Sequence, residues 1–329
     1  MTANASLPVA ASRSITIRCR LLLAISCAAA LMVLLAVSGA LRGQEAHASG
    51  ANATPYLFIT NSNLHMSTVK MMNLTDGSMT TIVDSGFTFT TTPTVIEVDQ
   101  EGGHIFYADT NQHISKIRLS DSATVGTIDA GNKVNYLALD RSSGKLYFTS
   151  TLIDTANWTQ NSQLRVWNPG HTAETLYAPT GNYSNILGTA VDETGGNVYF
   201  FQSTGAEVHH NSFMRMSAAT KAVASYKTGI GGNYTDMVID SASRKLYYTV
   251  SNTVGAVDLN TGTEQTLYTS GNADNYIKHI DFDSASGKIY FALSNNQYDS
   301  SVTIYRMNAD GSAVYPVHTG SNIKGFAVN

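Results

Sequence analysis

Residues 137–150 read LALDRSSGKLYFTS, an apolar-Asp pair followed after a short turn by two adjacent aromatic residues. The same pattern recurs along the chain. Its aspartates are 41 to 52 residues apart, and they are Asp99, Asp140, Asp192, Asp240 and Asp283. An internal repeat of this length, rich in short apolar runs, is typical of β-propeller blades.

Each repeat contains four runs of alternating apolar residues, which predicts four strands. Five complete repeats leave a loose end at each side of the series. Residues 56–84 supply a second, third and fourth strand without a first, and residues 323–329 match a first strand with nothing after it. Joining the two ends completes a sixth blade and removes an exposed sheet edge. We therefore predict an all-β fold, a six-bladed β-propeller of four-stranded antiparallel blades over residues 56–329, in which the C-terminal strand completes the N-terminal blade.

The repeat resembles the YWTD repeat of the low-density lipoprotein receptor family, within the wider group of six-bladed propellers that includes NHL and gluconolactonase-like proteins. The resemblance covers residues 56–329 and implies the architecture. It implies little about function, because one fold supports many activities. The chain has no flanking cysteine-rich modules, so a multidomain endocytic receptor is not implied.

The first 48 residues have the pattern of an export signal. Three arginines, the last of them Arg20, precede an apolar stretch at residues 21–37, and Ala46-His47-Ala48 resembles a cleavage site. Two interpretations stay open: a cleaved signal peptide, or an uncleaved signal anchor that makes a single-pass membrane protein with the propeller outside. Either places the propeller in a secreted, periplasmic or cell-surface location. Residues 49–55 are predicted to form a short linker.

Composition narrows the set of partners. Cys19 and Cys27 both lie in the N-terminal segment, so the exported part can form no disulfide and no thiolate metal site. The net charge is −4, and no cluster of Lys or Arg follows the N-terminus. A nucleic-acid partner is therefore excluded. We expect a monomer that contacts the membrane only if the N-terminal anchor is retained.

Connection lengths distinguish the two faces of the predicted propeller. The connections from first to second strand and from third to fourth strand are tight, as at Arg141 to Gly144 and Ser284 to Gly287. We predict that this tight-turn face offers little to a ligand. The other connections are longer and aromatic, and they define the long-loop face, where binding residues are expected to collect. The predicted ligand-binding residues on this face are Trp158, Tyr183, His209, His210, Tyr234, Tyr276 and Tyr298.

The leading hypothesis is a non-catalytic module that binds a protein, peptide or glycan through the long-loop face, because exposed Tyr and Trp suit such recognition. The alternative for the tyrosines is that they cap the blades. His209 and His210 lack an assignable third ligand, so an ordinary loop pair is favoured over a metal site.

The predicted innermost strands also place polar residues at the mouth of a central channel. They are Glu97, Asn135, Asp236 and His279, with Lys278, Asp281 and Lys324 nearby. We expect these groups to be solvated or paired with neighbours, for example His279 or Lys278 with Asp236. The alternative is a metal-dependent hydrolase of the gluconolactonase-like type, with one divalent cation at Glu97, Asn135 and Asp236. No G-x-S-x-G motif occurs, and the Pro-Asn-Gly and Pro-Asp-Gly segments expected from that resemblance are absent. We expect no cofactor. The repeated aspartates are predicted to accept hydrogen bonds from turn N–H groups instead of binding cations.

Overall fold

The alternation of apolar and polar residues within each repeat produces short antiparallel strands. The computed structural model describes residues 54–62, 67–84, 94–99, 101–110, 112–154, 159–181, 183–205, 210–230, 232–295 and 301–328. These residues form strands and turns and include no helix. The predicted export signal and most of the predicted linker lie outside the described residues.

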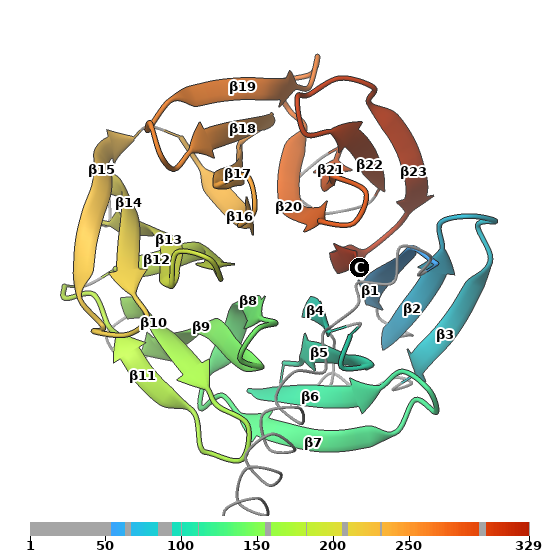
Figure 1. Ribbon diagram of the computed structural model, residues 1–329, viewed down its shortest axis with the longest axis horizontal. Helices are drawn as coiled ribbons and strands as arrows, with labels where there is room; N and C mark the ends of the chain where they lie inside the picture. The colour runs from blue at the N-terminus through green and yellow to red at the C-terminus, as the bar shows by residue number, and fades with distance from the viewer. Residues whose placement is uncertain are drawn as a thin grey trace, which may run out of the picture. The chain divides into compact units, whose positions relative to one another are not determined.

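The strands form six four-stranded sheets arranged as a ring around a centre, as Figure 1 shows. Blade 1 contains β24 (Ile323–Val328), β1 (Tyr56–Ser62), β2 (Ser67–Asn73) and β3 (Met79–Asp84). Blade 2 contains β4 (Val95–Asp99), β5 (His104–Ala108), β6 (His113–Arg118) and β7 (Thr124–Asp129). Blade 3 contains β8 (Lys133–Asp140), β9 (Lys145–Asp154), β10 (Thr159–Trp167) and β11 (Glu174–Tyr177).

The second half of the ring repeats this order. Blade 4 contains β12 (Asn185–Asp192), β13 (Asn197–Thr204), β14 (His210–Ser217) and β15 (Val223–Ile230). Blade 5 contains β16 (Tyr234–Asp240), β17 (Lys245–Val250), β18 (Thr253–Asp258) and β19 (Glu264–Thr269). Blade 6 contains β20 (Tyr276–Asp283), β21 (Lys288–Ser294), β22 (Val302–Asn308) and β23 (Tyr315–Gly320). In every blade the first strand named lies innermost (Figure 1).

The predicted closure of the ring is confirmed. β24 pairs antiparallel with β1, with Val328 opposite Leu57 and Phe326 opposite Ile59. The side chain of Thr60 adds a 3.1 Å hydrogen bond to the carbonyl oxygen of Gly325. In Figure 1 the C-terminus accordingly lies beside β1. Blade 1 is thus built from both ends of the propeller sequence.

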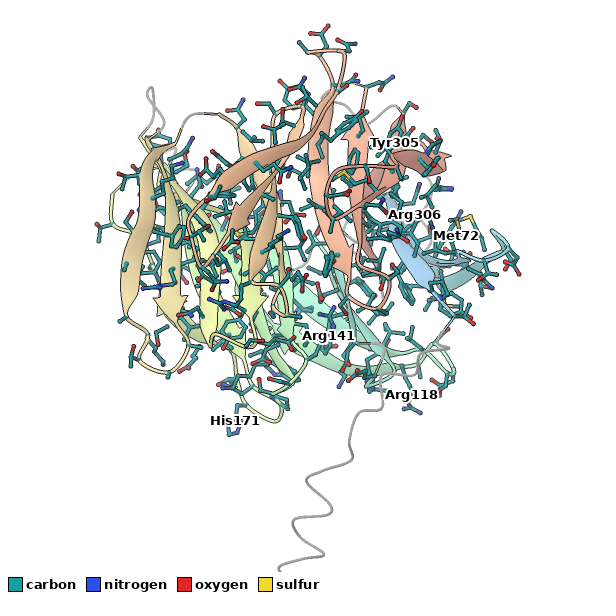
Figure 2. The ribbon with its side chains drawn as sticks, turned by 45° about the horizontal axis from the view of Figure 1, so that its top comes forward. Met72, Arg118, Arg141, His171, Tyr305 and Arg306 are labelled. Carbon is teal, nitrogen blue, oxygen red and sulfur yellow. The ribbon has the colours of Figure 1, made fainter. Side chains whose placement is uncertain are left out.

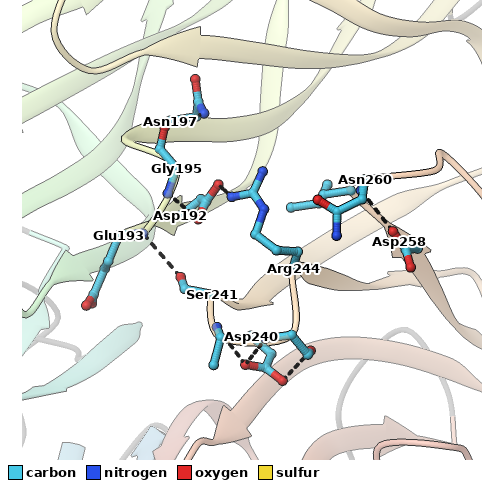
Figure 3. A network of polar contacts seen from close by, with 12 residues as sticks. Asp192, Glu193, Gly195, Asn197, Asp240, Ser241, Arg244, Asp258 and Asn260 are labelled. Carbon is cyan, nitrogen blue, oxygen red and sulfur yellow. Dashed lines mark hydrogen bonds and ion pairs between the residues drawn. The ribbon is translucent and has the colours of Figure 1, made fainter.

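The repeated aspartates have the structural role predicted for them. Asp99 accepts a 2.8 Å bond from the Gly102 N–H, and Asp192 accepts a 2.9 Å bond from the Gly195 N–H. The other three accept equivalent bonds from turn N–H groups: Asp140 from Ser143, Asp240 from Ala242 and Ser243, and Asp283 from Ala285 and Ser286. Figure 3 shows two of these turns, at Asp192 and Asp240. The carboxylate replaces water for the turn backbone, which fixes each tight connection.

Packing between blades holds the ring together. The apolar side chains form six buried clusters; one of them joins Phe106 of blade 2 to Leu139 and Phe148 of blade 3. The outer pair of strands in every blade contains a register shift. Such bulges protect a sheet edge from pairing with another chain. The innermost strand of each blade thus lies around the centre of the ring, and the irregular pairing lies in the outer strands.

Candidate functional site

The predicted long-loop face is unevenly built. β17 and β18 are joined only by Ser251 and Asn252, so not all connections on this face are long. Of the predicted binding residues, Trp158, His209 and Tyr298 lie outside the described residues. His210 begins β14, and its side chain is not among those described.

The β9–β10 hairpin has the longest described strands that reach this face. Its strands have 10 and 9 residues and are the two longest that the structure describes. β8 begins at Lys133, opposite Thr151. Beyond Thr151, β9 pairs with β10 alone among the described strands, up to Asp154 opposite Thr159. The end of the hairpin is therefore a two-stranded ribbon, which gains little stability by itself.

Two adjacent apolar side chains on this ribbon face solvent. Leu152 is 50% exposed and Ile153 is 56% exposed. Successive side chains of a strand point to opposite faces, so the ribbon presents an apolar group on each side. The other exposed large apolar residues of the described part are isolated along the chain: Met79, Val125 and Tyr315.

Tyr183 lies next to a residue that is hydrogen-bonded to this hairpin. The neighbouring Ser184 forms an isolated bridge with Asn161, and its carbonyl oxygen accepts a 2.9 Å bond from the Ser162 N–H. Tyr183 itself has a φ of +60°, in the left-handed region that is uncommon for a residue other than glycine. Such backbone strain is found more often at functional sites than elsewhere.

Tyr234 and Tyr276 have different surroundings. Tyr234 packs against Phe201 at 4.1 Å between ring centroids and against Tyr248 at 5.7 Å. Burial, followed by the neighbouring Tyr248, raises the pKa of Tyr234 to about 12. This packing matches the alternative in which the tyrosines cap the blades. Tyr276 begins β20 opposite Ser294 and is half-buried.

Part of the predicted channel-mouth cluster is brought together. Asp236 on β16 and His279 on β20 lie in adjacent blades, with 3.6 Å between the Asp236 Oδ2 and the His279 Nδ1. Asp236 also accepts bonds from the N–H groups of Met237 (2.9 Å) and Ile280 (3.3 Å). The Asn135 amide donates instead to the Thr151 hydroxyl, in its own blade. The pairing favoured from sequence thus exists between His279 and Asp236.

A second group lies where the innermost strands approach the tight-turn face. The Arg141 Nη2 atom is 3.1 Å from the Glu97 Oε1 atom, and the Arg141 N–H donates a 3.0 Å bond to Glu193. Asp281 accepts 2.7 Å bonds from the N–H groups of Phe282 and Val328. Figure 2 places Arg141 on the same side of the molecule as Arg118 and His171, which lie at other tight turns.

The expectation that the tight-turn face offers little to a ligand stays a prediction, but sequence reasoning did not identify this group of charged residues. Arg141 follows the repeated Asp140 directly, and its long side chain reaches Glu97 on the neighbouring innermost strand. The only sequence signal was a basic residue at a position occupied elsewhere by Gln100, Glu193, Ser241 and Ser284. Leu152 and Ile153 were missed because an apolar pair at the end of a predicted strand is normally buried.

Several ionisable side chains on or near the innermost strands have shifted pKa values. Burial raises the pKa of Glu97 to about 8, and Asp281, Asp236 and Glu193 add to this effect while Arg141 opposes it. Burial likewise raises the pKa of Asp281 to about 6. Burial raises the pKa of Tyr136, and the nearby Asp236 carboxylate adds to this. Burial alone would lower the pKa of Arg141, but the surrounding carboxylates, Glu97 first, raise it.

Within the described ranges, no group of three or more His, Cys, Asp or Glu side chains has a geometry able to hold a metal ion. The part of the chain that the structure describes contains no helix long and apolar enough to span a membrane.

Comparisons with known proteins add information at the level of fold. No protein-family model matches the sequence, and no curated protein matches it. A chain in the crystal structure of a nidogen/laminin complex is similar, with a TM-score of 0.62 and 12% identity, covering 83% of this chain and 98% of that chain. A putative TolB from Agrobacterium tumefaciens has a TM-score of 0.59 and 11% identity, covering 83% and 92%. TolB from Acinetobacter baumannii has a TM-score of 0.57 and 14% identity, covering 83% and 66%. These similarities and the observed blades confirm the six-bladed propeller fold expected from the YWTD-like repeat.

Proposed function

We propose that the chain is an exported, non-catalytic binding module that recognises a protein partner through the long-loop face, with the β9–β10 hairpin as its anchor. The observation that carries this proposal is the solvent exposure of Leu152 and Ile153 on the end of β9, which pairs there with β10 alone among the described strands. We name Leu152, Ile153 and Tyr183 the hairpin patch.

The energetic argument is that exposed apolar groups become favourable only when something covers them. Burying a Leu or Ile side chain stabilises a complex by about 1.5 to 3 kcal/mol. A ribbon with apolar groups on both sides suits insertion into a groove of a protein. It suits a glycan less, because the Leu and Ile side chains offer sugar hydroxyls no hydrogen-bonding group. A protein partner is therefore favoured over a glycan, and a short peptide is the remaining alternative.

The similar structures give a precedent for protein binding. A chain with this fold occurs in a complex of nidogen with laminin. At 12% identity the precedent concerns the scaffold alone. Export is part of the proposal because of the arginines and the apolar stretch at residues 21–37.

The test begins by identifying the partner. A photo-crosslinking residue at position 153 should capture a protein from the extracellular or periplasmic fraction. The same residue at position 125, where Val125 is exposed on the outer strand β7, serves as the matched control.

Affinity measurement with the purified partner follows. We expect Leu152→Ser with Ile153→Ser to weaken binding by about thirtyfold or more, the effect of losing about 2 kcal/mol at a hot spot. The control pair Met79→Ser with Val125→Ser removes similar exposed apolar area from outer strands and should leave affinity intact. Equal losses from both pairs, or full affinity of the hairpin variant, would contradict the assignment. Binding of a glycan array with undiminished strength by the hairpin variant would point to the glycan alternative.

A further inference from the structure

The junction between blades 4 and 5 differs from the other junctions in its aromatic content. Six aromatic side chains of these two blades pack together, with 4.1 to 6.1 Å between neighbouring ring centroids: Tyr199, Phe201, Phe213, Tyr226, Tyr234 and Tyr248. The next largest group of rings in the described residues has three members, Tyr268, Phe291 and Tyr305. Because this feature is confined to one junction, the repeat alone does not explain it.

A small pocket lies between the same two blades. Its apolar wall is formed by Phe201 and Phe213 of blade 4 and by Leu246, Val257 and the rings of Tyr234 and Tyr248 of blade 5. Its empty space is about 230 Å³ with the open mouth included, which is below the roughly 300 to 1,000 Å³ of a typical site for a drug-sized ligand. The pocket therefore suits a single side chain or a comparably small group.

An ion pair joins the outermost strands of the two blades at this pocket (Figure 1). Lys227 on β15 and Glu264 on β19 both line the pocket, with 2.5 Å between the Nζ and Oε1 atoms. The two side chains are 47% and 39% exposed, and an ion pair of this kind contributes little to stability because water screens it. The protein thus already holds an ammonium group at the pocket, by a contact that another cation can replace.

Two tyrosine hydroxyls add neutral oxygen atoms near the Glu264 carboxylate. Burial raises the pKa of Tyr234 to about 12, and Tyr248 and then Glu264 add to this. Burial also raises the pKa of Tyr248, and Glu264 again adds to the effect. Both hydroxyls therefore keep their protons at neutral pH, and neither is hydrogen-bonded to another residue that the structure describes. A primary ammonium has three N–H donors, the same number as these acceptor groups.

Gly255 makes room for one of these tyrosines. It lies opposite Tyr248 in the pairing of β17 with β18. A Cβ atom at position 255 would lie 2.6 Å from the Tyr248 hydroxyl oxygen and would also collide with the ring. Any other residue here would displace the ring, so the glycine is required for the present shape of the pocket.

We propose that the pocket between blades 4 and 5 binds a primary alkylammonium group, either the lysine side chain of another protein or a small free amine, which displaces Lys227 from Glu264. The incoming alkyl chain lies against Leu246 and Val257, and the aromatic rings favour a positive charge through their π-electrons. An anion is disfavoured because the Glu264 carboxylate would repel it. The site is separate from the hairpin patch and does not depend on the proposed function.

The experiment titrates the full-length chain with n-butylammonium chloride at constant ionic strength and measures Kd by ligand-observed NMR. We expect saturable binding in the millimolar range. Glu264→Gln removes the carboxylate and should weaken binding about tenfold, the usual effect of losing a hydrogen bond to a charged group. Lys227→Ala removes the competing cation and should strengthen binding about threefold, as expected for an exposed ion pair. Both residues are partly exposed, so the variants should fold, and their melting temperatures check this.

The matched control is a second ion pair on the outside of the ring. Lys221 and Glu174 are 3.1 Å apart and similarly exposed, but they do not line this pocket. Lys221→Ala and Glu174→Gln should therefore leave Kd unchanged. Equal weakening by Glu264→Gln and Glu174→Gln would overturn the proposal, because it would show a general attraction of cations to an acidic chain.

Three further results would also contradict the proposal. They are weaker binding by Lys227→Ala, which would indicate an anionic or zwitterionic ligand; equally strong binding of n-butanol, which would show that charge is not recognised; and no saturable binding by either the wild type or Lys227→Ala. Nα-acetyl-lysine methylamide distinguishes the two sources of the ammonium group. Binding as strong as that of n-butylammonium would identify the lysine side chain of a protein, and binding of n-butylammonium alone would identify a free amine.

Discussion

The two faces of the propeller differ in how far the blades resemble one another. On the tight-turn face five blades end their innermost strand with an aspartate that accepts turn N–H bonds. On the long-loop face the described parts of the blades vary: two residues join β17 to β18, whereas β9 and β10 extend into a ribbon with exposed Leu152 and Ile153. Features that recur from blade to blade serve folding, and features confined to one blade are the better candidates for function.

The charged residues of the innermost strands combine a repeated position with a residue type that is not repeated. Each occurs in only one or two blades: Glu97 in blade 2, Asp236 in blade 5 and Asp281 in blade 6. The repeat therefore supplies the positions, and individual substitutions within it supply the chemistry.

Removing the closing strand β24 should destabilise the propeller more than any other change. Deletion of residues 322–329 removes β24, whose buried Ile323, Phe326 and Val328 join the core, and leaves the edge of β1 unpaired. We expect aggregation or loss of cooperative unfolding, measured by light scattering and calorimetry. A truncated protein that stays monomeric with an unchanged melting temperature would show that the ring does not need β24.

Unequal effects are expected within the repeated turns. Asp192 is fully buried and pairs with Arg244 of the next blade, whereas Asp240 serves only its own turn, as Figure 3 shows. Asp192→Ala removes the turn bond and the partner of the partly exposed Arg244 and should cost about 2 to 4 kcal/mol. Asp240→Ala should cost about 1 to 2 kcal/mol. Urea unfolding of both variants measures the difference, and equal losses would mean that the Arg244 pair contributes nothing beyond the turn.

Two leucines on the same strand should differ in their contribution to stability. Leu146 and Leu152 both lie on β9, but Leu146 is fully buried and Leu152 is half exposed on the ribbon. Leu146→Ala should destabilise the fold by about 2 to 5 kcal/mol. Leu152→Ala should change stability by less than about 0.5 kcal/mol. A large loss from Leu152→Ala would place it in the core and remove the main support for the hairpin patch.

The sequence predicted the parts of this molecule that repeat. The strand at residues 323–328 was identifiable because it matched five other strands, and the aspartate turns because each recurred with the same spacing. Arg141 could not be placed in this way, because a long side chain can reach solvent or a neighbouring blade from the same backbone position. The exposure of Leu152 and Ile153 depends on where β8 begins relative to β9, which is a matter of strand register and not of composition.

Of all the changes considered, adding divalent cations should have the smallest effect on the stability of the fold. A site bound at 100 times its Kd would stabilise the fold by about 2.7 kcal/mol. Such a site at Glu97, Asn135 and Asp236 would have to compete with Arg141, with the Thr151 hydroxyl, and with His279 and two backbone N–H groups. We therefore expect Ca²⁺, Mn²⁺ or Zn²⁺ to change the melting temperature of metal-free protein by less than about 1 °C. Asp236→Ala is the decisive control, because Zn²⁺ can bind histidines elsewhere on the surface. A clear rise in melting temperature that Asp236→Ala abolishes would mean that the channel ligands exchange their internal partners for a metal, and the hydrolase alternative would then replace the binding module.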